Sequence, residues 1–203
     1  MRLIVGISGA TGAIYGIRLL EVLRHLRTAA GLEGGSQGGV ETHLVISRAA
    51  ERTIAWETPY SVESVRVLAD RCYAVQDIGA GISSGSFPAD GMVIAPCSVK
   101  TLAAVATGVC DNLLTRAADV TLKERRRLVL LVREAPLSLS HIRNMAEVTK
   151  MGAVVAPPVP AFYNHPHTVD DIINHTVGRV LDLFGFDAGL VKRWEGMRQA
   201  PVS

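Results

Sequence analysis

The first sixteen residues constrain the fold of this chain more than any other stretch. An apolar run from Leu3 to Ile7 is followed by a turn that contains Gly9 and Gly12, and then by a helix with leucines along one face. This order predicts a strand, a tight turn and a helix. The glycines let the backbone approach a ligand, and the helix start offers unpaired N–H groups and a positive dipole to an anion. We therefore predict a phosphate site at this turn, to which Thr11 adds a hydroxyl.

The rest of the chain alternates between apolar strands and amphipathic helices. Further strands are expected at 43–46, 72–75, 92–95, 128–132 and 153–156. This alternation with short connections predicts an α/β protein with an open, mainly parallel sheet covered by helices on both faces. The length of 203 residues fits a single domain over residues 1–203. The glycine-rich stretch 31–39 is expected to be a flexible surface loop.

Composition and charge narrow the classes of function. The net charge is only +2 and the one basic block is the triplet 125–127, so nothing indicates nucleic-acid binding. No apolar run approaches the ~20 residues of a membrane span, and the chain begins with a strand rather than a signal peptide. Three scattered cysteines fit a reducing cytosol and argue against a disulfide framework or a zinc site. We therefore expect a cytoplasmic protein without a membrane span.

Polar side chains follow the predicted strands at the points where the strands end. They are Thr11, Ser47, Ser98 with Thr101, Arg133 with Glu134, and Tyr163. In an open parallel sheet the carboxyl ends of the strands meet at one edge, where ligands bind. Because this set is rich in hydroxyls and cations and poor in carboxylates, it predicts a pocket for a phosphorylated ligand.

Other functions also fit part of the pattern. A nicotinamide-dependent reductase has a similar turn, and Arg48 could bind the extra phosphate of NADP. Such an enzyme needs a Tyr-x-x-x-Lys pair, however, and none of the four tyrosines is followed by a lysine at that spacing. His165 and His167 form a candidate metal pair, although no cluster of carboxylates or thiolates lies near them. Cys97 is a candidate nucleophile, but a helix start also explains a small buried thiol, and we favour this structural interpretation. We favour the phosphate pocket.

Five stretches of the sequence carry a resemblance to a known family. They cover 6–13, 96–101, 116–126, 132–136 and 157–163, beginning with Gly-Ile-Ser-Gly-Ala-Thr-Gly-Ala and ending with Pro-Pro-Val-Pro-Ala-Phe-Tyr. In this order they resemble the UbiX family, the flavin prenyltransferases that were formerly taken for aromatic acid decarboxylases. The resemblance extends from Met1 to about Trp194, essentially the whole chain.

The resemblance implies a fold, a reaction and partners. The fold would be a flavodoxin-like or Rossmann-like three-layer sandwich, assembled into a homo-oligomer, as in the dodecamers of relatives. The enzyme would join the dimethylallyl group of dimethylallyl monophosphate to N5 and then to C6 of reduced FMN, without a metal. The product, prenylated FMN, would serve a UbiD-type decarboxylase of ubiquinone synthesis or of aromatic acid decarboxylation. Two alternatives keep the fold: an FMN-dependent cysteine decarboxylase and a non-catalytic flavin carrier.

The functional residues of the family carry over by motif. The resemblance implies catalytic roles for Glu134, Glu57 and Thr11, and no metal ligands. Thr11 stands where many relatives have serine, so the hydroxyl is kept and a methyl group is added. The FMN contacts would be Gly9, Ala10, Thr11, Ser47, Ser98, Val99, Lys100, Thr101 and Arg133, and the prenyl-phosphate contacts would be Arg116, Lys123, Tyr163 and Arg179.

Overall fold

The computed structural model describes residues 1–29, 39–194 and 196. They divide into two compact units, Met1–Pro158 and Val159–Ser203, which we describe separately. The expected single domain over residues 1–203 stays a prediction. The glycine-rich stretch 31–39 lies outside the described residues except for Gly39.

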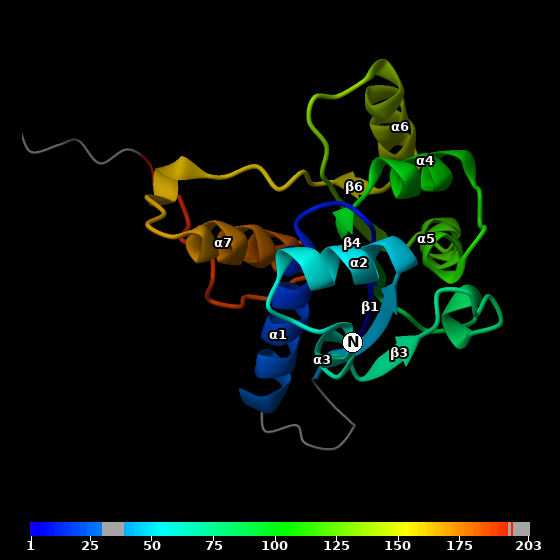
Figure 1. Ribbon diagram of the computed structural model, residues 1–203, viewed down its shortest axis with the longest axis horizontal. Coiled ribbons are helices and arrows are strands. Elements are labelled where there is room, and N and C mark those ends of the chain that lie inside the picture. Colours follow the sequence, from blue (N-terminus) through cyan, green and yellow to red (C-terminus); the bar gives the residue numbers. More distant parts are fainter. Residues whose placement is uncertain (30–38, 195, 197–203) are drawn as a thin grey trace, which may run out of the picture. The chain divides into compact units, whose positions relative to one another are not determined.

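The first unit is built on a six-stranded sheet in the order β3-β2-β1-β4-β5-β6, in which all neighbouring strands are parallel (Figure 1). This confirms the predicted α/β class with an open parallel sheet. The chain order reverses between β1 and β4, and such a switch point is where parallel sheets bind ligands. The strands are β1 (Arg2–Ile7), β2 (Glu41–Ile46), β3 (Arg71–Tyr73), β4 (Gly91–Cys97), β5 (Arg127–Val132) and β6 (Val154–Val155).

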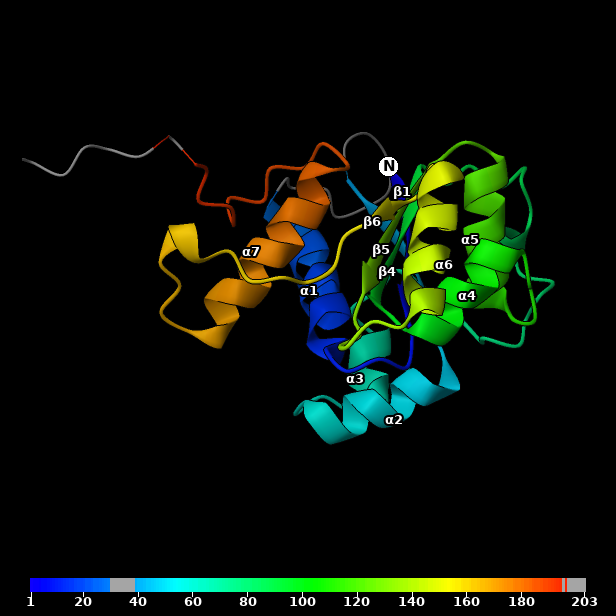
Figure 2. The ribbon, with the colours of Figure 1, turned by 90° about the horizontal axis from the view of Figure 1, so that it is seen from above.

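Helices cover both faces of this sheet (Figure 2). One face carries α1, and the other carries α4, α5 and α6. No helix in the described part of the chain is both long and apolar enough to span a membrane. The helices of this unit are α1 (Ala13–Ala29), α2 (Arg48–Glu57), α3 (Val62–Arg66), α4 (Val99–Thr107), α5 (Leu113–Lys123) and α6 (Leu139–Lys150), with a 3-10 turn η1 (Gly81–Ser83).

The core follows from the two-residue alternation of the strands. Ile4, Met92 and Leu128 belong to one buried cluster with apolar residues of α4, α5 and α6. On the opposite face α1 packs so closely that a Cβ atom at Gly16 would collide with the Ala95 carbonyl oxygen. Because both faces are covered, the carboxyl edge of the sheet is left for a ligand.

Side-chain caps fix where the helices begin. Ser61 accepts a hydrogen bond from the Ser64 N–H (3.0 Å) at the start of α3. Ser64 donates its hydroxyl to the Ser61 carbonyl, so this is an ordinary cap and not a capping box. Such caps hold each loop-to-helix junction in one geometry, which matters where the junction faces the carboxyl edge.

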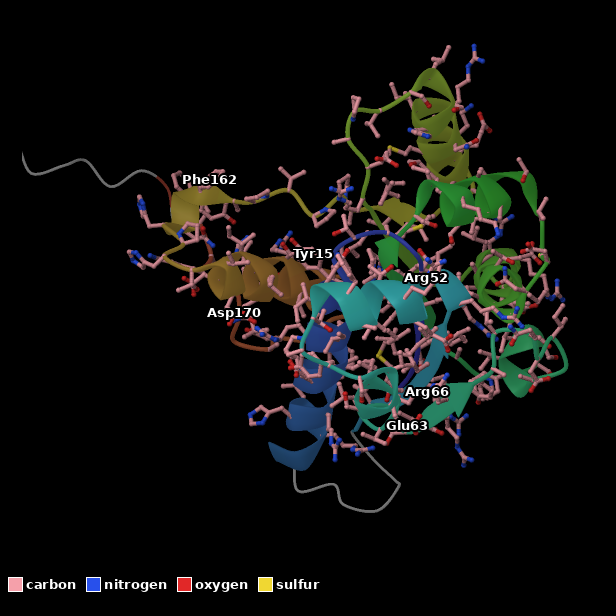
Figure 3. All side chains as sticks on the ribbon, in the orientation of Figure 1. Tyr15, Arg52, Glu63, Arg66, Phe162 and Asp170 are labelled. Carbon is pink, nitrogen blue, oxygen red and sulfur yellow. The ribbon has the colours of Figure 1, made fainter. Side chains whose placement is uncertain are left out.

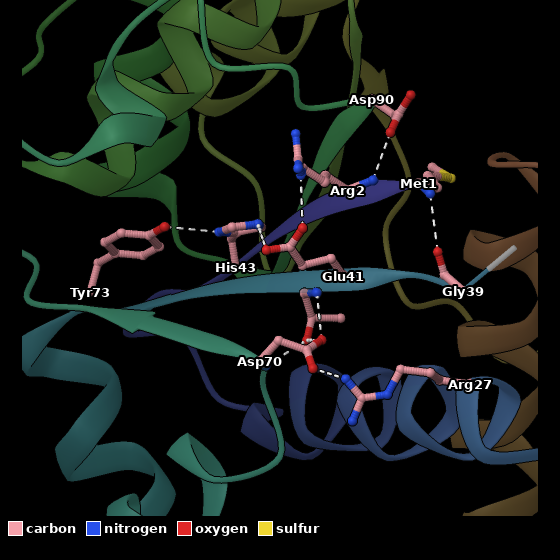
Figure 4. A network of polar contacts seen from close by, with 10 residues as sticks. Met1, Arg2, Arg27, Gly39, Glu41, His43, Asp70, Tyr73 and Asp90 are labelled. Carbon is pink, nitrogen blue, oxygen red and sulfur yellow. Dashed lines mark hydrogen bonds and ion pairs between the residues drawn. The ribbon is translucent and has the colours of Figure 1, made fainter. Parts of the chain in front are cut away.

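The amino edge of the sheet holds a polar network (Figure 4). His43 is 2% exposed, and its Nδ1 lies 2.9 Å from the Tyr73 hydroxyl. Its Nε2 makes a longer contact of 3.4 Å with Glu41, which accepts a hydrogen bond from Arg2 at 2.7 Å. The Phe87 ring packs edge-on against the imidazole. Burial lowers the pKa of His43, while Arg2 lowers the pKa of Glu41. This network supports the sheet at the end opposite to the predicted pocket.

The second unit consists of a 3-10 turn, η2 (Phe162–Asn164), and the helix α7 (Val169–Asp182). Thr168 caps α7 in a capping box with Asp171. The hydroxyl of Tyr163 lies 3.3 Å from Nε2 of His175, and the Trp194 ring packs edge-on against Tyr163. Tyr163 is therefore held by two partners within its own unit.

Candidate functional site

Hydrogen bonds tie the carboxyl ends of four neighbouring strands together. The Ser47 N–H donates to the Ile7 carbonyl (3.0 Å) between β2 and β1. The Ser8 N–H donates to the Pro96 carbonyl (3.2 Å) between β1 and β4, and the Arg133 N–H donates to the Cys97 carbonyl (3.1 Å) between β5 and β4. The polar residues that follow these strands are thereby fixed relative to one another.

A cavity of about 970 Å³ lies at this edge. The residues expected at the strand ends meet there, as the sequence predicted for Thr11, Ser47, Ser98, Thr101, Arg133 and Glu134. The lining residues are Gly9, Ala10, Thr11, Ser47, Arg48, Ala49, Val75, Gln76, Ser98, Val99, Lys100, Thr101, Ala104, Asp111, Asn112, Leu114, Thr115, Arg133 and Glu134.

Three helices begin at the cavity wall. Ser98 caps α4 by accepting a hydrogen bond from the Thr101 N–H (3.2 Å), and Ser47 caps α2 in the same way. Asn112 caps α5 through the Thr115 N–H (3.1 Å). The first N–H groups beyond each cap have no partner within the helix, and the positive ends of three helix dipoles face one space. This arrangement suits an anion such as a phosphate.

The charged side chains of the cavity are mostly cations. Arg48, Lys100 and Arg133 line it, against the carboxylates of Asp111 and Glu134. Glu134 accepts a hydrogen bond from the N–H of Ala135 (3.0 Å). In the described part of the chain no ion pair joins Lys100, Arg133 or Glu134 to another residue. These groups are therefore available to a ligand, which fits the predicted phosphate pocket.

The start of α1 differs from the prediction. The carboxylate of Glu57, at the end of α2, accepts hydrogen bonds from the N–H groups of Gly12 (2.7 Å) and Ala13 (3.3 Å). The expected free anion site at this helix start is wrong, because the chain's own carboxylate occupies it. Gly12 has φ +94°, which favours glycine, and a Cβ at Gly9 would collide with Ala49. The turn contributes Gly9, Ala10 and Thr11 to the cavity instead.

Tyr15 lies in the first turn of α1 (Figure 3). Its side chain is partly buried, and this burial raises the pKa of its phenol. Tyr15 does not line the cavity. We assign it to the packing that supports the turn.

Four of the expected residues lie elsewhere. The Arg116 guanidinium on α5 donates to the Ser83 carbonyl (3.2 Å) and pairs with Asp119 (2.7 Å). Lys123, at the other end of α5, pairs with Glu124. Neither Arg116 nor Lys123 lines the cavity. Tyr163 and Arg179 belong to the second unit, where Arg179 pairs with Asp182 at 2.6 Å.

Cys97 has the surroundings of a structural residue. It is fully buried, and burial raises the pKa of its thiol to about 12. A thiol that stays protonated is a poor nucleophile. Among residues 1–29, 39–194 and 196, no three His, Cys, Asp or Glu side chains gather as metal ligands would.

Sequence reasoning missed part of the cavity wall. The Leu113 N–H donates to the Val75 carbonyl (2.8 Å), which brings the start of α5 to the end of β3. This long-range contact brings the 111–115 stretch beside Val75 and Gln76 at the cavity wall. The sequence does indicate that Asn112 caps a helix, since an amphipathic segment follows it. It does not indicate that the start of this helix lies beside the end of β3.

Comparison with known proteins identifies the family. A family model described as Flavoprotein matches residues 1–181. The flavin prenyltransferase UbiX of Thauera aromatica is 55% identical over 203 residues, covering 100% of this chain and 98% of the relative. The crystal structure of AnUbiX in complex with FMN and dimethylallyl pyrophosphate matches with a TM-score of 0.90 and 53% identity, covering 97% of this chain and 98% of AnUbiX. This chain belongs to the UbiX family of flavin prenyltransferases.

A second UbiX-like structure extends the comparison. The dodecameric FMN-dependent UbiX-like decarboxylase from Escherichia coli O157:H7 is 52% identical with a TM-score of 0.89, covering 97% of this chain and 100% of that one. UbiX membership confirms the resemblance carried by the five stretches. The cysteine decarboxylase and flavin carrier alternatives are not favoured, since curated relatives of 54% and 55% identity are named flavin prenyltransferase UbiX.

Proposed function

We propose that this chain joins the dimethylallyl group of dimethylallyl monophosphate to N5 and C6 of reduced FMN, giving prenylated FMN. The observation that carries the proposal is the cavity at the carboxyl edge of the sheet, where three helix starts and the cations of Arg48, Lys100 and Arg133 face one space. The family supports the same reaction. AnUbiX was crystallised with FMN and dimethylallyl pyrophosphate, a near relative of the proposed substrate.

The cavity fits FMN in size and in chemistry. Its volume of about 970 Å³ lies within the range of ~300–1,000 Å³ that is usual for ligand sites. The hydroxyls and N–H groups at the start of α4 suit the phosphate, together with Lys100 and Arg133. The apolar side chains of Val75, Val99 and Leu114 suit the flat ring system. When bound, reduced FMN supplies the nucleophilic atoms N5 and C6.

The residues of the chain would promote the transfer through charge and proton movement. A departing phosphate gains negative charge, which Lys123, Arg133 and Arg179 would hold more tightly as it develops. Glu134, at the cavity wall, would take up and return a proton through its carboxylate oxygens. Glu57 would act from the start of α1, where its carboxylate accepts the N–H of Gly12, the residue after Thr11. Tyr163 and Arg116 would complete the prenyl-phosphate contacts.

We further propose that the site is completed in a homo-oligomer. Arg116 and Lys123 do not line the cavity of their own chain, so they would reach a bound substrate from another copy. A UbiX-like relative of 52% identity is dodecameric, which supports an assembly of this size.

The surroundings of the reaction follow from the family resemblance. We propose a cytoplasmic enzyme that needs no metal and passes prenylated FMN to a UbiD-type decarboxylase. Transfer of the product to such a decarboxylase gives it activity that free FMN does not, and this can be measured with the two purified proteins.

The test of the function is direct. The purified protein is incubated anaerobically with reduced FMN and dimethylallyl monophosphate, and the flavin is extracted for absorbance and mass. A flavin heavier by one prenyl unit, formed equally with and without EDTA, supports the proposal. Unchanged FMN, or a reaction lost with EDTA and restored by a divalent ion, contradicts it. Dimethylallyl pyrophosphate in a parallel reaction distinguishes the two prenyl donors.

A further inference from the structure

Ser8 is a buried hydroxyl directly behind the cavity. It follows the last residue of β1 and precedes the Gly9 turn, and it is only 1% exposed. It does not line the cavity. Nothing in the proposed chemistry uses it, so its burial needs a separate reason.

The Ser8 hydroxyl connects the end of β1 to the start of α4. It donates to the Pro96 carbonyl (2.9 Å) and accepts from the Ser98 N–H (2.7 Å). The one proton of the Ser8 hydroxyl is thereby donated to a carbonyl. The Ser98 N–H, which takes no part in the hydrogen bonds within α4, finds its acceptor in the Ser8 oxygen. All three ties between neighbouring strand ends described above run between backbone groups, whereas the partner of the Ser98 N–H is a side chain.

The position of Ser98 sets the geometry of the α4 start. Its hydroxyl oxygen accepts from the Thr101 N–H (3.2 Å) and lies 3.1 Å from the Thr101 hydroxyl oxygen. Val99 and Lys100, the next two residues, line the cavity, and the first N–H groups of a helix have no partner within it. A shift of Ser98 therefore moves the whole group of donors that faces the ligand.

We propose that Ser8 is a positioning residue that holds the α4 start in the geometry that binds the flavin phosphate. The inference rests on the proposed FMN site. Without the hydroxyl, the Ser98 N–H loses its buried acceptor and the cap moves to regain one. Affinity for FMN then falls, although no atom that contacts FMN has been changed.

The first experiment compares Ser8→Ala with a matched control. Thr42 is 3% exposed at the amino edge of the sheet, and its hydroxyl likewise donates to Asp70 Oδ2 (3.0 Å) and accepts from the Asp70 N–H (3.0 Å). Both Ser8→Ala and Thr42→Val should lower the melting temperature. Only Ser8→Ala should raise the Kd for FMN, by about tenfold or more, the scale for one orphaned buried donor. Amide hydrogen exchange at Ser98 should speed up in Ser8→Ala alone.

The second experiment separates positioning from general destabilisation by a double-mutant cycle with Ser98→Ala. If Ser8 acts through the Ser98 cap, Ser8→Ala should change the Kd for FMN much less in a protein that already carries Ser98→Ala. We expect a change of about threefold or less in that background. Effects that multiply in the double variant contradict the proposal. Ser8→Cys, with a weakly hydrogen-bonding thiol, repeats the measurement if Ser8→Ala does not fold, and an unchanged Kd there overturns the idea. Failure of the unmodified protein to bind FMN would instead overturn the proposed function.

Discussion

The carboxylate of Glu134 is the proposed acid–base group of the cavity. It follows β5 at the carboxyl edge, lines the cavity beside Arg133, and accepts only the N–H of Ala135 among the described residues. A structural role in an ion pair would require a cation partner. In the described part of the chain Glu134 forms no ion pair with Arg133. The carboxylate is therefore available for proton exchange.

Glu134→Gln should slow prenyl transfer by roughly 10²-fold or more, because glutamine keeps the size but cannot exchange a proton. Binding of FMN and of the prenyl phosphate should stay near normal. Single-turnover rates and equilibrium titrations measure the two effects separately. Glu147→Gln on α6, which removes an exposed partner of Lys150, is the control and should leave both unchanged. Transfer at the normal rate, or loss of FMN binding, would make Glu134 structural and pass the acid–base role to Glu57.

His43 carries a second prediction, about stability and pH. Burial lowers its folded-state pKa below the value of ~6.5 expected in the unfolded chain. The unfolded state therefore binds the proton more readily, so the contribution of His43 is fully present above about pH 6.5 and is lost as the pH falls below it. Glu41 opposes this shift, while Arg2 and Arg71 reinforce it.

His43→Asn should be less stable than the unmodified protein at pH 7.5, but its stability should fall less between pH 7.5 and pH 5.5. Urea unfolding at several pH values gives both slopes. His175, whose pKa is also lowered by burial, stays in both proteins and sets the shared background. Parallel slopes in the two proteins would show that His43 does not titrate in this range.

At the scale of elements, the start of α1 is stabilised by α2. The Glu57 carboxylate binds two N–H groups of α1 and adds a negative charge at the positive end of the helix dipole. The small residues of α4 allow this helix to pack closely against other parts of its own chain. Ala103, Ala104 and Ala106 belong to a helix that packs beside α6 (Figure 2), and Ala104 also lines the cavity.

Glu57→Gln should lower the free energy of unfolding by about 0.5 to 1 kcal/mol, because an exposed charge near a helix N-terminus contributes on this scale. Hydrogen exchange should accelerate at the amides of Gly12 and Ala13, whose acceptor has lost its charge. The control is Glu63→Gln in the first turn of α3, an exposed carboxylate paired with Arg66. Unchanged exchange at Gly12 would mean that charge is unimportant in this contact.

At the scale of the whole molecule, the position of the α5 cations fits our proposal that each site contains residues from more than one copy of the chain. Arg116 and Lys123 are held on their own chain by Asp119 and Glu124, away from the cavity. A substrate bound in the cavity would meet them only across an interface. The assembly is thus part of the proposed chemistry.

Co-expression of Lys123→Ala with Glu134→Gln should therefore restore part of the activity. Each variant alone should be nearly inactive, yet mixed assemblies contain sites with an intact Lys123 from one copy and an intact Glu134 from another. Differently tagged chains allow the mixed assemblies to be purified and assayed. Co-expression of Arg133→Ala with Glu134→Gln is the control, because these two residues line the cavity of one chain and no mixed site has both. Equal recovery in both mixtures would contradict a shared site.

The sequence by itself determined the local elements and the residues at the strand ends. Alternating apolar residues depend on neighbours within a few positions, which is why the strands and the polar residues that follow them could be predicted. Only the tertiary structure decided what meets at the cavity. The contact of Leu113 with Val75, the carboxylate of Glu57 at the α1 start, and the Ser8 bond to Ser98 all join residues distant in the chain. Such pairings depend on strand order and packing, which no local pattern encodes.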